Sequence, residues 1–298
     1  MISGKSVLVR DSDAADMLEL LFVVAVATIL INRAFLALTG YPRIAFGHFH
    51  IAHMLWGGLL MLISIVMLVH YWNPSVRRTA SLLSGIGFGL FIDELGKFIT
   101  KDNDYFFQPT IAIIYVIFVV MYLSFRKMTA SSSPLSGDEM RVNSAIREQL
   151  GSVGTESLSP FLRGYYRTRE RLTSLTARLL AHHRVIPAIM VVFALKSIMQ
   201  FVVVLGIMDP GWMPLENLSG ISLAGALVSD VMVITGLLLM KGDRMRGLRW
   251  FKRAVLLNIF VTQVFLFYQS QLTAIWGLGA DLAVYAAIDY RLRMRIPE

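Results

Sequence analysis

The chain has 298 residues, of which 56% are hydrophobic and 16% are charged, and its mean hydropathy is +0.62. Soluble domains contain about 45–50% apolar and about 25% charged residues, so this composition excludes an ordinary soluble protein and indicates a polytopic membrane protein. The absence of cysteine excludes disulfides, thiolate metal sites and thiol nucleophiles. The net charge of +8 does not require a nucleic-acid partner, because Lys and Arg gather on the cytoplasmic side of membrane proteins.

Long apolar runs predict an all-α bundle of eight membrane-spanning helices. A bilayer core of about 30 Å needs about 20 helical residues to cross it. The first run follows acidic rather than basic residues, so we expect a retained span and not a cleaved signal peptide. The eight predicted spans cover residues 15–38, 47–72, 79–100, 108–125, 185–208, 219–240, 250–270 and 275–291.

Basic residues gather in the loops that eight spans place on one side of the membrane. Arg77 and Arg78 lie between the second and third spans, and Arg126 and Lys127 follow the fourth. The stretch "KGDRMRGLRWFKR" lies between the sixth and seventh spans, and "RLRMR" follows the eighth. Because Lys and Arg accumulate in cytoplasmic loops, we expect both termini of the chain to be cytoplasmic.

Residues 126–184 form the long segment that no predicted span covers. Within it, "SSSPLSG" at 131–137 indicates a linker, and residues 160–184 combine apolar positions with a basic face. This pattern is typical of a helix on the cytoplasmic leaflet whose Arg side chains meet anionic lipid headgroups. A simple basic connector is the alternative. The chain then divides into a four-span half at 1–125, this segment, and a second four-span half at 185–298.

The two halves also suggest a degenerate repeat. At one constant separation in sequence, Tyr115 corresponds to Tyr285 and Asp93 to Gln263, and each half has a basic loop between its second and third spans. A parallel duplication about an axis along the membrane normal fits this pattern. In such a repeat the acidic pair of Asp93 and Glu94 would remain only in the first half.

Ionisable residues interrupt two apolar runs near their outer ends. "GHFHIAHMLWGG" places His50 and His53 at the start of the second span, and "GIGFGLFIDELGKF" places Asp93, Glu94 and Lys97 near the end of the third. At 1.5 Å per helical residue, His53 and Asp93 lie at a similar depth of about 9–10 Å. His50 and His53 would share one face of a helix. An ionisable side chain at mid-span costs about 2.5–3.5 kcal/mol, so we expect these groups to turn inward and to be paired, hydrated or metal-bound.

Three functions fit such a pocket. In the first, His50, His53 and Asp93 hold Zn²⁺ or another divalent metal with open positions. Glu94 would then be the general base and Lys97 the counter-ion or electrophile of a hydrolase acting on a lipid or other amphiphile. In the second, the same groups carry protons or cations in a transporter or channel. In the third, the protein is a non-catalytic membrane scaffold and the groups form a satisfied internal network.

Other charged residues lie within the predicted spans. Arg33, in the outer half of the first span, can supply a counter-charge to the pocket. Lys196, Asp230 and Asp281 lie in the fifth, sixth and eighth spans, where they can form a relay or an ion pair, and Gln263 is a neutral partner. The sequence has no serine-hydrolase signature, no phosphate-binding loop and no well-placed haem ligands, so we expect no haem, nucleotide or flavin.

Two stretches also carry a resemblance to other proteins. "HFHIAHMLWGGLLML", followed by "GIGFGLFIDELGKFITKDNDYFF", resembles a recurring pattern in uncharacterised bacterial multi-pass inner-membrane proteins. Those proteins have a His-rich start to one span, a Trp-Gly after it and an Asp-Glu pair in the next. The resemblance covers about residues 45–110. It implies a location in the bacterial inner membrane and adds weight to His50, His53, Asp93 and Glu94, but it implies no activity.

Overall fold

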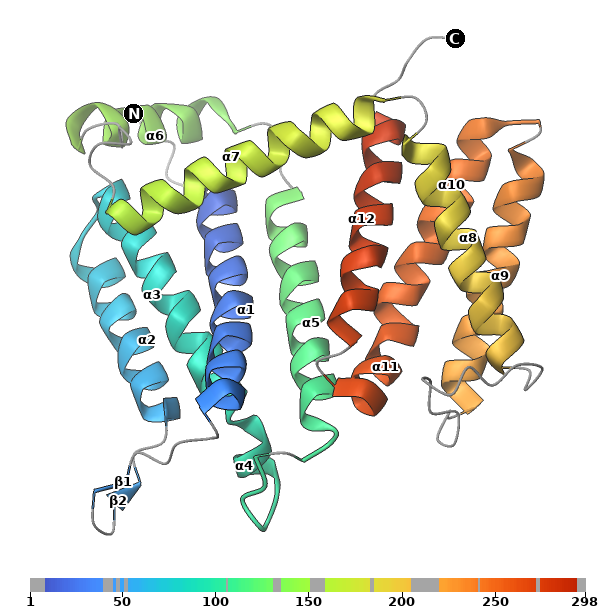
Figure 1. Ribbon diagram of the computed structural model, residues 1–298. Helices are drawn as coiled ribbons and strands as arrows, with labels where there is room; N and C mark the ends of the chain where they lie inside the picture. Colours follow the sequence, from blue (N-terminus) through green and yellow to red (C-terminus); the bar gives the residue numbers. More distant parts are fainter. Residues whose placement is uncertain are drawn as a thin grey trace. The chain divides into compact units, whose positions relative to one another are not determined.

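A computed structural model gives the fold of the chain (Figure 1). Outside loops, its described residues are helical, apart from a short antiparallel hairpin of β1 (Ala45–Phe46) and β2 (Phe49–His50). The structure describes residues 9–39, 45–46, 49–50, 53–105, 107–130, 135–150, 159–182, 185–204, 220–240, 242–271 and 274–293. The all-helical class expected from the sequence is confirmed.

The chain forms two compact units. Unit 1 comprises Met1–Phe107 and Ile117–Arg167, and unit 2 comprises Gln108–Val116 and Thr168–Glu298. These boundaries differ from the division predicted at 125 and 184. The predicted halves were defined by membrane spans, which the compactness of the units does not test, so that division and the internal repeat stay predictions.

Unit 1 is built around three helices, α1 (Ala14–Thr39), α2 (His53–His70) and α3 (Pro74–Asp93), with α3 packed against both others (Figure 1). It also contains the short α4 (Leu95–Ile99), most of α5 (Thr110–Ala130), α6 (Gly137–Leu150) and the start of α7 (Pro160–Ala181). The ring of Phe118 on α5 packs against Phe22 and Phe88, and Leu162 on α7 is buried beside Leu20 and Leu82.

Glycines set the close approach of these three helices. A Cβ atom on Gly87 would lie 2.7 Å from the carbonyl oxygen of Gly57, so α2 and α3 meet backbone to backbone. On the opposite side of α3, a Cβ atom on Gly85 or Gly89 would lie 2.7 Å from a carbonyl oxygen of α1. Small residues permit such contacts between membrane helices, and the glycine-rich run "SGIGFG" therefore positions the end of α3 against both neighbours.

Within the described residues, unit 2 contains six further helical elements and parts of α5 and α7. Asp243 caps the N-terminus of α10 by accepting hydrogen bonds from the backbone nitrogens of Met245 and Arg246. Phe251, Val255 and Ile288 are among the buried residues of its core. The elements are α8 (Val185–Val204), α9 (Gly220–Leu239), α10 (Arg244–Leu257), which continues through a π-helical turn η2 (Asn258–Thr262) into α11 (Gln263–Ser270), and α12 (Ala274–Arg293).

Within the described residues, four helices are long and apolar enough to cross a membrane, or five if a bent pair is one span. The four are Ala14–Thr39, His53–His70, Thr110–Thr129 and Arg244–Tyr268, and the bent pair joins Pro160–Leu180 to Val185–Met199. Long apolar helices therefore support a membrane protein. The other predicted spans fall on α3, α9 and α12, but charged residues such as Arg77, Arg78 and Asp281 lower the hydropathy of α3 and α12.

Three helix ends differ from the bounds of the predicted spans. The span predicted at 47–72 begins as a helix only at His53, because Ala45 and Phe46 pair with His50 and Phe49 in a hairpin. The span predicted at 79–100 begins at Pro74, a residue suited to the first helical turn, and breaks at Glu94. The helix predicted from 250 begins at Arg244, since Asp243 provides its cap.

Two segments of the predicted connector are helical. Residues 137–150 form α6, which the sequence analysis did not predict, and the predicted surface helix at 160–184 corresponds to α7. Exposed apolar side chains on α7 include Phe161, Leu172 and Leu179. Contact between this helix and anionic lipid stays a prediction.

Candidate functional site at the ends of α1, α2 and α3

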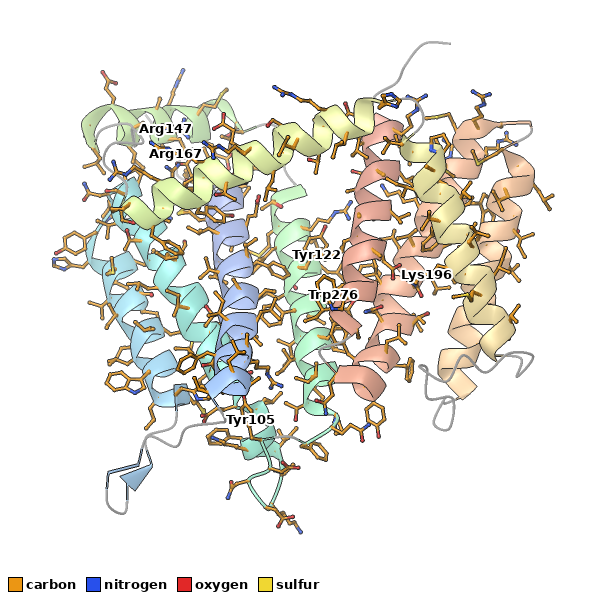
Figure 2. All side chains as sticks on the ribbon, in the orientation of Figure 1. Tyr105, Tyr122, Arg147, Arg167, Lys196 and Trp276 are labelled. Atoms are coloured by element: carbon orange, nitrogen blue, oxygen red, sulfur yellow. The ribbon has the colours of Figure 1, made fainter. Side chains whose placement is uncertain are left out.

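The predicted polar residues meet where three helices of unit 1 end. His53 is the first residue of α2, Asp93 is the last residue of α3, and Glu94 occupies the break between α3 and α4. Arg33 lies near the C-terminal end of α1. Figure 2 shows Tyr105 at this same end of unit 1, beside α4. The helix ends therefore bring basic, acidic and imidazole groups into one cluster.

Asp93 is the most fully paired residue of the site. Its side chain is completely buried, and its Oδ1 accepts a hydrogen bond from Arg33 Nε at 2.5 Å. Its Oδ2 accepts hydrogen bonds from Asn32 Nδ2 and from the Tyr105 hydroxyl, each at 2.8 Å, and lies 3.4 Å from His53 Nε2. Both oxygens therefore have donors, which stabilises the ionised carboxylate away from water.

Glu94 is equally buried but only half paired. Its Oε1 lies 2.8 Å from His53 Nδ1 and accepts a hydrogen bond from Lys97 Nζ at 3.2 Å. Its Oε2 is buried and has no hydrogen-bond partner among the residues that the structure describes. Leaving a buried polar atom unpaired is costly, so this oxygen is the place in the site where a proton, water molecule or small cation would be stabilised.

His53 bridges the two carboxylates. A protonated imidazole has two N–H donors, and the two ring nitrogens of His53 face Glu94 Oε1 and Asp93 Oδ2. A neutral imidazole has one donor and one acceptor. In that form Nδ1 would donate to Glu94, while Nε2 would accept from Asn32 Nδ2, which lies 3.4 Å away. The surroundings therefore provide partners for both protonation states of this one ring.

Tyr105 closes the cluster from the loop after α4. Arg33 and Lys97 both lie over its ring, at 5.2 Å and 5.4 Å from the ring centre. Burial raises the pKa of the Tyr105 hydroxyl above its ordinary value, and the neighbouring Asp93 carboxylate raises it further. The hydroxyl therefore stays protonated and acts as a hydrogen-bond donor.

The structure brings together four of the five predicted site residues. His53, Asp93, Glu94 and Lys97 are in contact, and the expected counter-charge from Arg33 is confirmed. His50 lies in β2 and not in the first turn of α2, so the expectation that it shares a helical face with His53 is wrong. The described part of His50 is its backbone, and the position of its side chain lies outside the described residues.

Metal binding is a separate question from this clustering. Within the described part of the chain, no three His, Asp or Glu side chains are arranged to hold a metal ion. Metal binding by His50, His53 and Asp93 therefore stays a prediction.

The sequence did not identify two hydrogen-bond donors of the site, Asn32 and Tyr105. Neither stands out, because Asn32 is a neutral residue beside Arg33 and Tyr105 lies in a polar loop beyond the predicted span.

Unit 2 contains a second ion pair, in which the carboxylate of Asp281 is completely buried and Lys196 is partly exposed. Lys196 Nζ on α8 (labelled in Figure 2) donates to Asp281 Oδ1 on α12, and Asn258 Nδ2 in the π-helical turn donates to Asp281 Oδ2, both at 2.6 Å. Asp230 is also buried, and in the described ranges its Oδ2 has no hydrogen-bond partner. The predicted ion pair is thus present between Lys196 and Asp281. Gln263 donates instead to the carbonyl oxygen of Ala274.

Comparison with known proteins finds no matching family model, no matching curated protein and no matching solved structure. The resemblance of residues 45–110 to bacterial multi-pass proteins therefore stays a prediction.

Proposed function

We propose that the chain is a multi-pass membrane protein that binds and releases protons at His53 and its two carboxylates, and that this exchange drives the passage of protons or a coupled cation. The observation that carries the proposal is the position of His53, whose two ring nitrogens each face a different buried carboxylate. Ionisable residues in membrane-spanning segments are typical of proton and ion pathways. The unpaired Oε2 of Glu94 supplies a second position for the transferred proton or cation.

The same geometry favours this function over a metal-dependent hydrolase. Asp93 already accepts hydrogen bonds from Arg33, Asn32 and Tyr105. A divalent cation bound to its carboxylate would compete with these donors, and a metal on His53 would take a ring nitrogen that now faces a carboxylate. A proton requires neither change, since His53 has a suitable partner in both of its protonation states.

We further propose that the site faces the outer side of a bacterial inner membrane. Each of the eight predicted spans overlaps a helical segment, which supports an eight-span topology with cytoplasmic termini. In unit 1, Arg77, Arg78 and Arg147 gather at the end opposite the site, where they pair with Asp11 and Asp13. Because basic residues favour the cytoplasmic side, this arrangement supports an outer location for His53.

The test is proton flux into liposomes that contain the purified protein and a trapped pH-sensitive dye. An imposed pH gradient should drive flux above that of protein-free liposomes. His53→Asn and Glu94→Gln should each reduce the flux by about tenfold or more, because each removes a proton-accepting group. His70→Asn, at the opposite end of the same helix, is the matched control and should leave the flux unchanged.

Flux that survives both site variants would contradict the assignment of the pathway. An absence of flux in the wild-type protein under proton, sodium and potassium gradients would contradict transport. The network would then serve only to hold α1, α2 and α3 together, as the scaffold hypothesis predicts.

A further inference from the structure

A cavity of about 580 Å³ lies in unit 1, at the end opposite the His53 site. It forms where three segments meet: the residues that precede α1, the turn between α2 and α3, and helix α6. Figure 1 shows α6 at this end of unit 1, near the start of α1. The volume falls within the range of about 300–1,000 Å³ that is usual for small-molecule sites.

Specific long-range contacts build the walls of the cavity. Arg10 Nε pairs with Glu139 Oε1 at 2.8 Å, and Asn143 Nδ2 donates to the backbone oxygen of Arg10 at 2.9 Å. The backbone nitrogen of Ser12 donates to Asn143 Oδ1 at 2.9 Å, and Arg147 Nη2 pairs with Asp13. These contacts join segments more than a hundred residues apart, so the cavity is a built feature of the fold and not a gap between loosely placed loops.

The lining combines three guanidinium groups and the carboxylates of Asp11 and Asp13 with apolar and aromatic surface. Arg77 and Arg147 both line the cavity, and both are partly exposed. A guanidinium has five N–H donors, and the ion pair of Arg77 with Asp11 joins Nη1 to one carboxylate oxygen. Further donors can therefore meet an anionic group. The apolar and aromatic part of the lining consists of Met17, Leu68, Tyr71, Trp72, Val142 and Ile146.

The cavity lies beside the ends of two candidate membrane spans. It lies where the candidate span α1 begins, at Ala14, and where the candidate span α2 ends, at His70. Tyr71 and Trp72 directly follow α2 and are exposed, as is typical of aromatic residues at a membrane–water interface. If α1 and α2 cross the membrane as proposed, the cavity lies at the depth of the lipid headgroups.

We propose that this cavity binds a phospholipid. The phosphate of the headgroup would accept hydrogen bonds from Arg77 and Arg147, because planar guanidinium groups match phosphate oxygens. The adjoining acyl chain would lie along Leu68 and Ile146. Basic pockets at the cytoplasmic ends of membrane helices are suited to such headgroups. The apolar walls distinguish a lipid phosphate from free phosphate, which would gain nothing from them.

The test is native mass spectrometry of the full chain in detergent, titrated separately with short-chain phosphatidylglycerol, short-chain phosphatidylcholine and inorganic phosphate. Both lipids should bind at least about tenfold more tightly than inorganic phosphate, since burial of each methylene contributes about 0.8 kcal/mol. Arg147→Gln should weaken lipid binding about tenfold or more, because a hydrogen bond to a charged group is lost. Arg141→Gln is the control, since Arg141 is an exposed residue of α6 that does not line the cavity.

Two results would overturn the proposal. One is lipid binding by an Arg77→Gln/Arg147→Gln double variant that equals wild-type binding. The other is inorganic phosphate that binds as tightly as either lipid. Thermal unfolding of each variant without lipid identifies a variant that has lost its fold. In that case Arg147→Lys, which keeps the charge but not the planar donor pair, should still bind lipid more weakly than Arg141→Gln.

Discussion

At the scale of single residues, Asp93 shows how unit 1 accommodates a charge away from water. A buried carboxylate is tolerated only when donors replace the water that it loses, and Asp93 receives them from Arg33, Asn32 and Tyr105. The donors come from α1 and from the loop after α4, so Asp93 also joins separate segments. The hydrogen bonds around Asp93 therefore stabilise the fold of unit 1 as well as the charge of this carboxylate.

Removal of the Asp93 charge should destabilise the protein. Asp93→Asn leaves the guanidinium of Arg33, which is 10% exposed, without its ionic partner. Breaking one side of a buried ion pair costs about 3–5 kcal/mol, so we expect a large fall in the thermal unfolding temperature in detergent. Asp102→Asn, in the exposed loop nearby, should have little effect. Equal unfolding temperatures for the two variants would contradict the structural role of Asp93.

The sequence predicted the charged members of this site and missed the neutral ones. Buried charges can be inferred from sequence because hydrocarbon cannot solvate them, so Asp93, Glu94 and Lys97 had to find partners. That argument gives no reason to select Asn32 among polar residues, or Tyr105 among the aromatics of an interfacial loop. The sequence also predicted His53 close to Asp93 and Glu94, but only the coordinates show which ring nitrogen faces which carboxylate.

At the scale of single elements, the backbone contact between α2 and α3 determines how closely the site residues approach. Gly87→Ala would place a Cβ atom 2.7 Å from the carbonyl oxygen of Gly57, and backbone has to move to relieve this contact. We expect a destabilisation of about 1–3 kcal/mol, as for overpacked interiors.

A neighbouring glycine provides the control for this prediction. No described atom lies within 4 Å of a Cβ atom built on Gly58, so Gly58→Ala should stabilise α2 by about 0.5–1 kcal/mol through helix propensity. Thermal unfolding of the two variants should therefore change in opposite directions. A stabilising Gly87→Ala substitution would show that the two helices do not pack at this distance.

Helix α6 depends on an ion pair that acid should break. Hydrogen bonds from Arg10 and from the backbone of Ser136 hold the pKa of Glu139 well below its ordinary value of 4.5. Because the folded pKa is lowered, this contribution is present above pH 4.5 and is lost as the pH falls through the lowered pKa. Hydrogen exchange in α6 should therefore become faster in acid, in excess of the intrinsic rate. Arg10→Gln should remove this dependence, and an unchanged profile in that variant would contradict it.

Most helices could be predicted from apolar runs, whereas their ends could not. The break falls at Glu94, whose side chain meets His53 of α2, and an apolar run does not reveal such a long-range contact. The late start of α2 reflects the pairing of β1 with β2, which competes with helix formation. Helix α6 was missed because its mostly exposed, polar sequence has no hydrophobic run to reveal it.

At the scale of the whole molecule, each of the two units contains a completely buried aspartate that is paired with a basic side chain. In unit 1 the pair belongs to a cluster at one end of the helices, and a phospholipid cavity is proposed at the other end. In unit 2, Lys196 and Asp281 meet beside a π-helical turn, a distortion that is frequent at functional sites. Composition alone predicted a membrane protein. Hydropathy alone does not give the number of spans, because charged residues lower the hydropathy of helices such as α3.

In the proposed function His53 takes up and releases a proton while it lies between two buried carboxylates, and nitrogen NMR of histidine-labelled protein measures this change of protonation state. The chain has six histidines, so His53→Asn assigns the signals of this ring. Between about pH 5 and about pH 10, His53 should change from a ring with protons on both nitrogens to one with a proton on Nδ1 only. A ring that keeps a single protonation state over this range, or that shows the shift of a metal-bound nitrogen, would contradict the account.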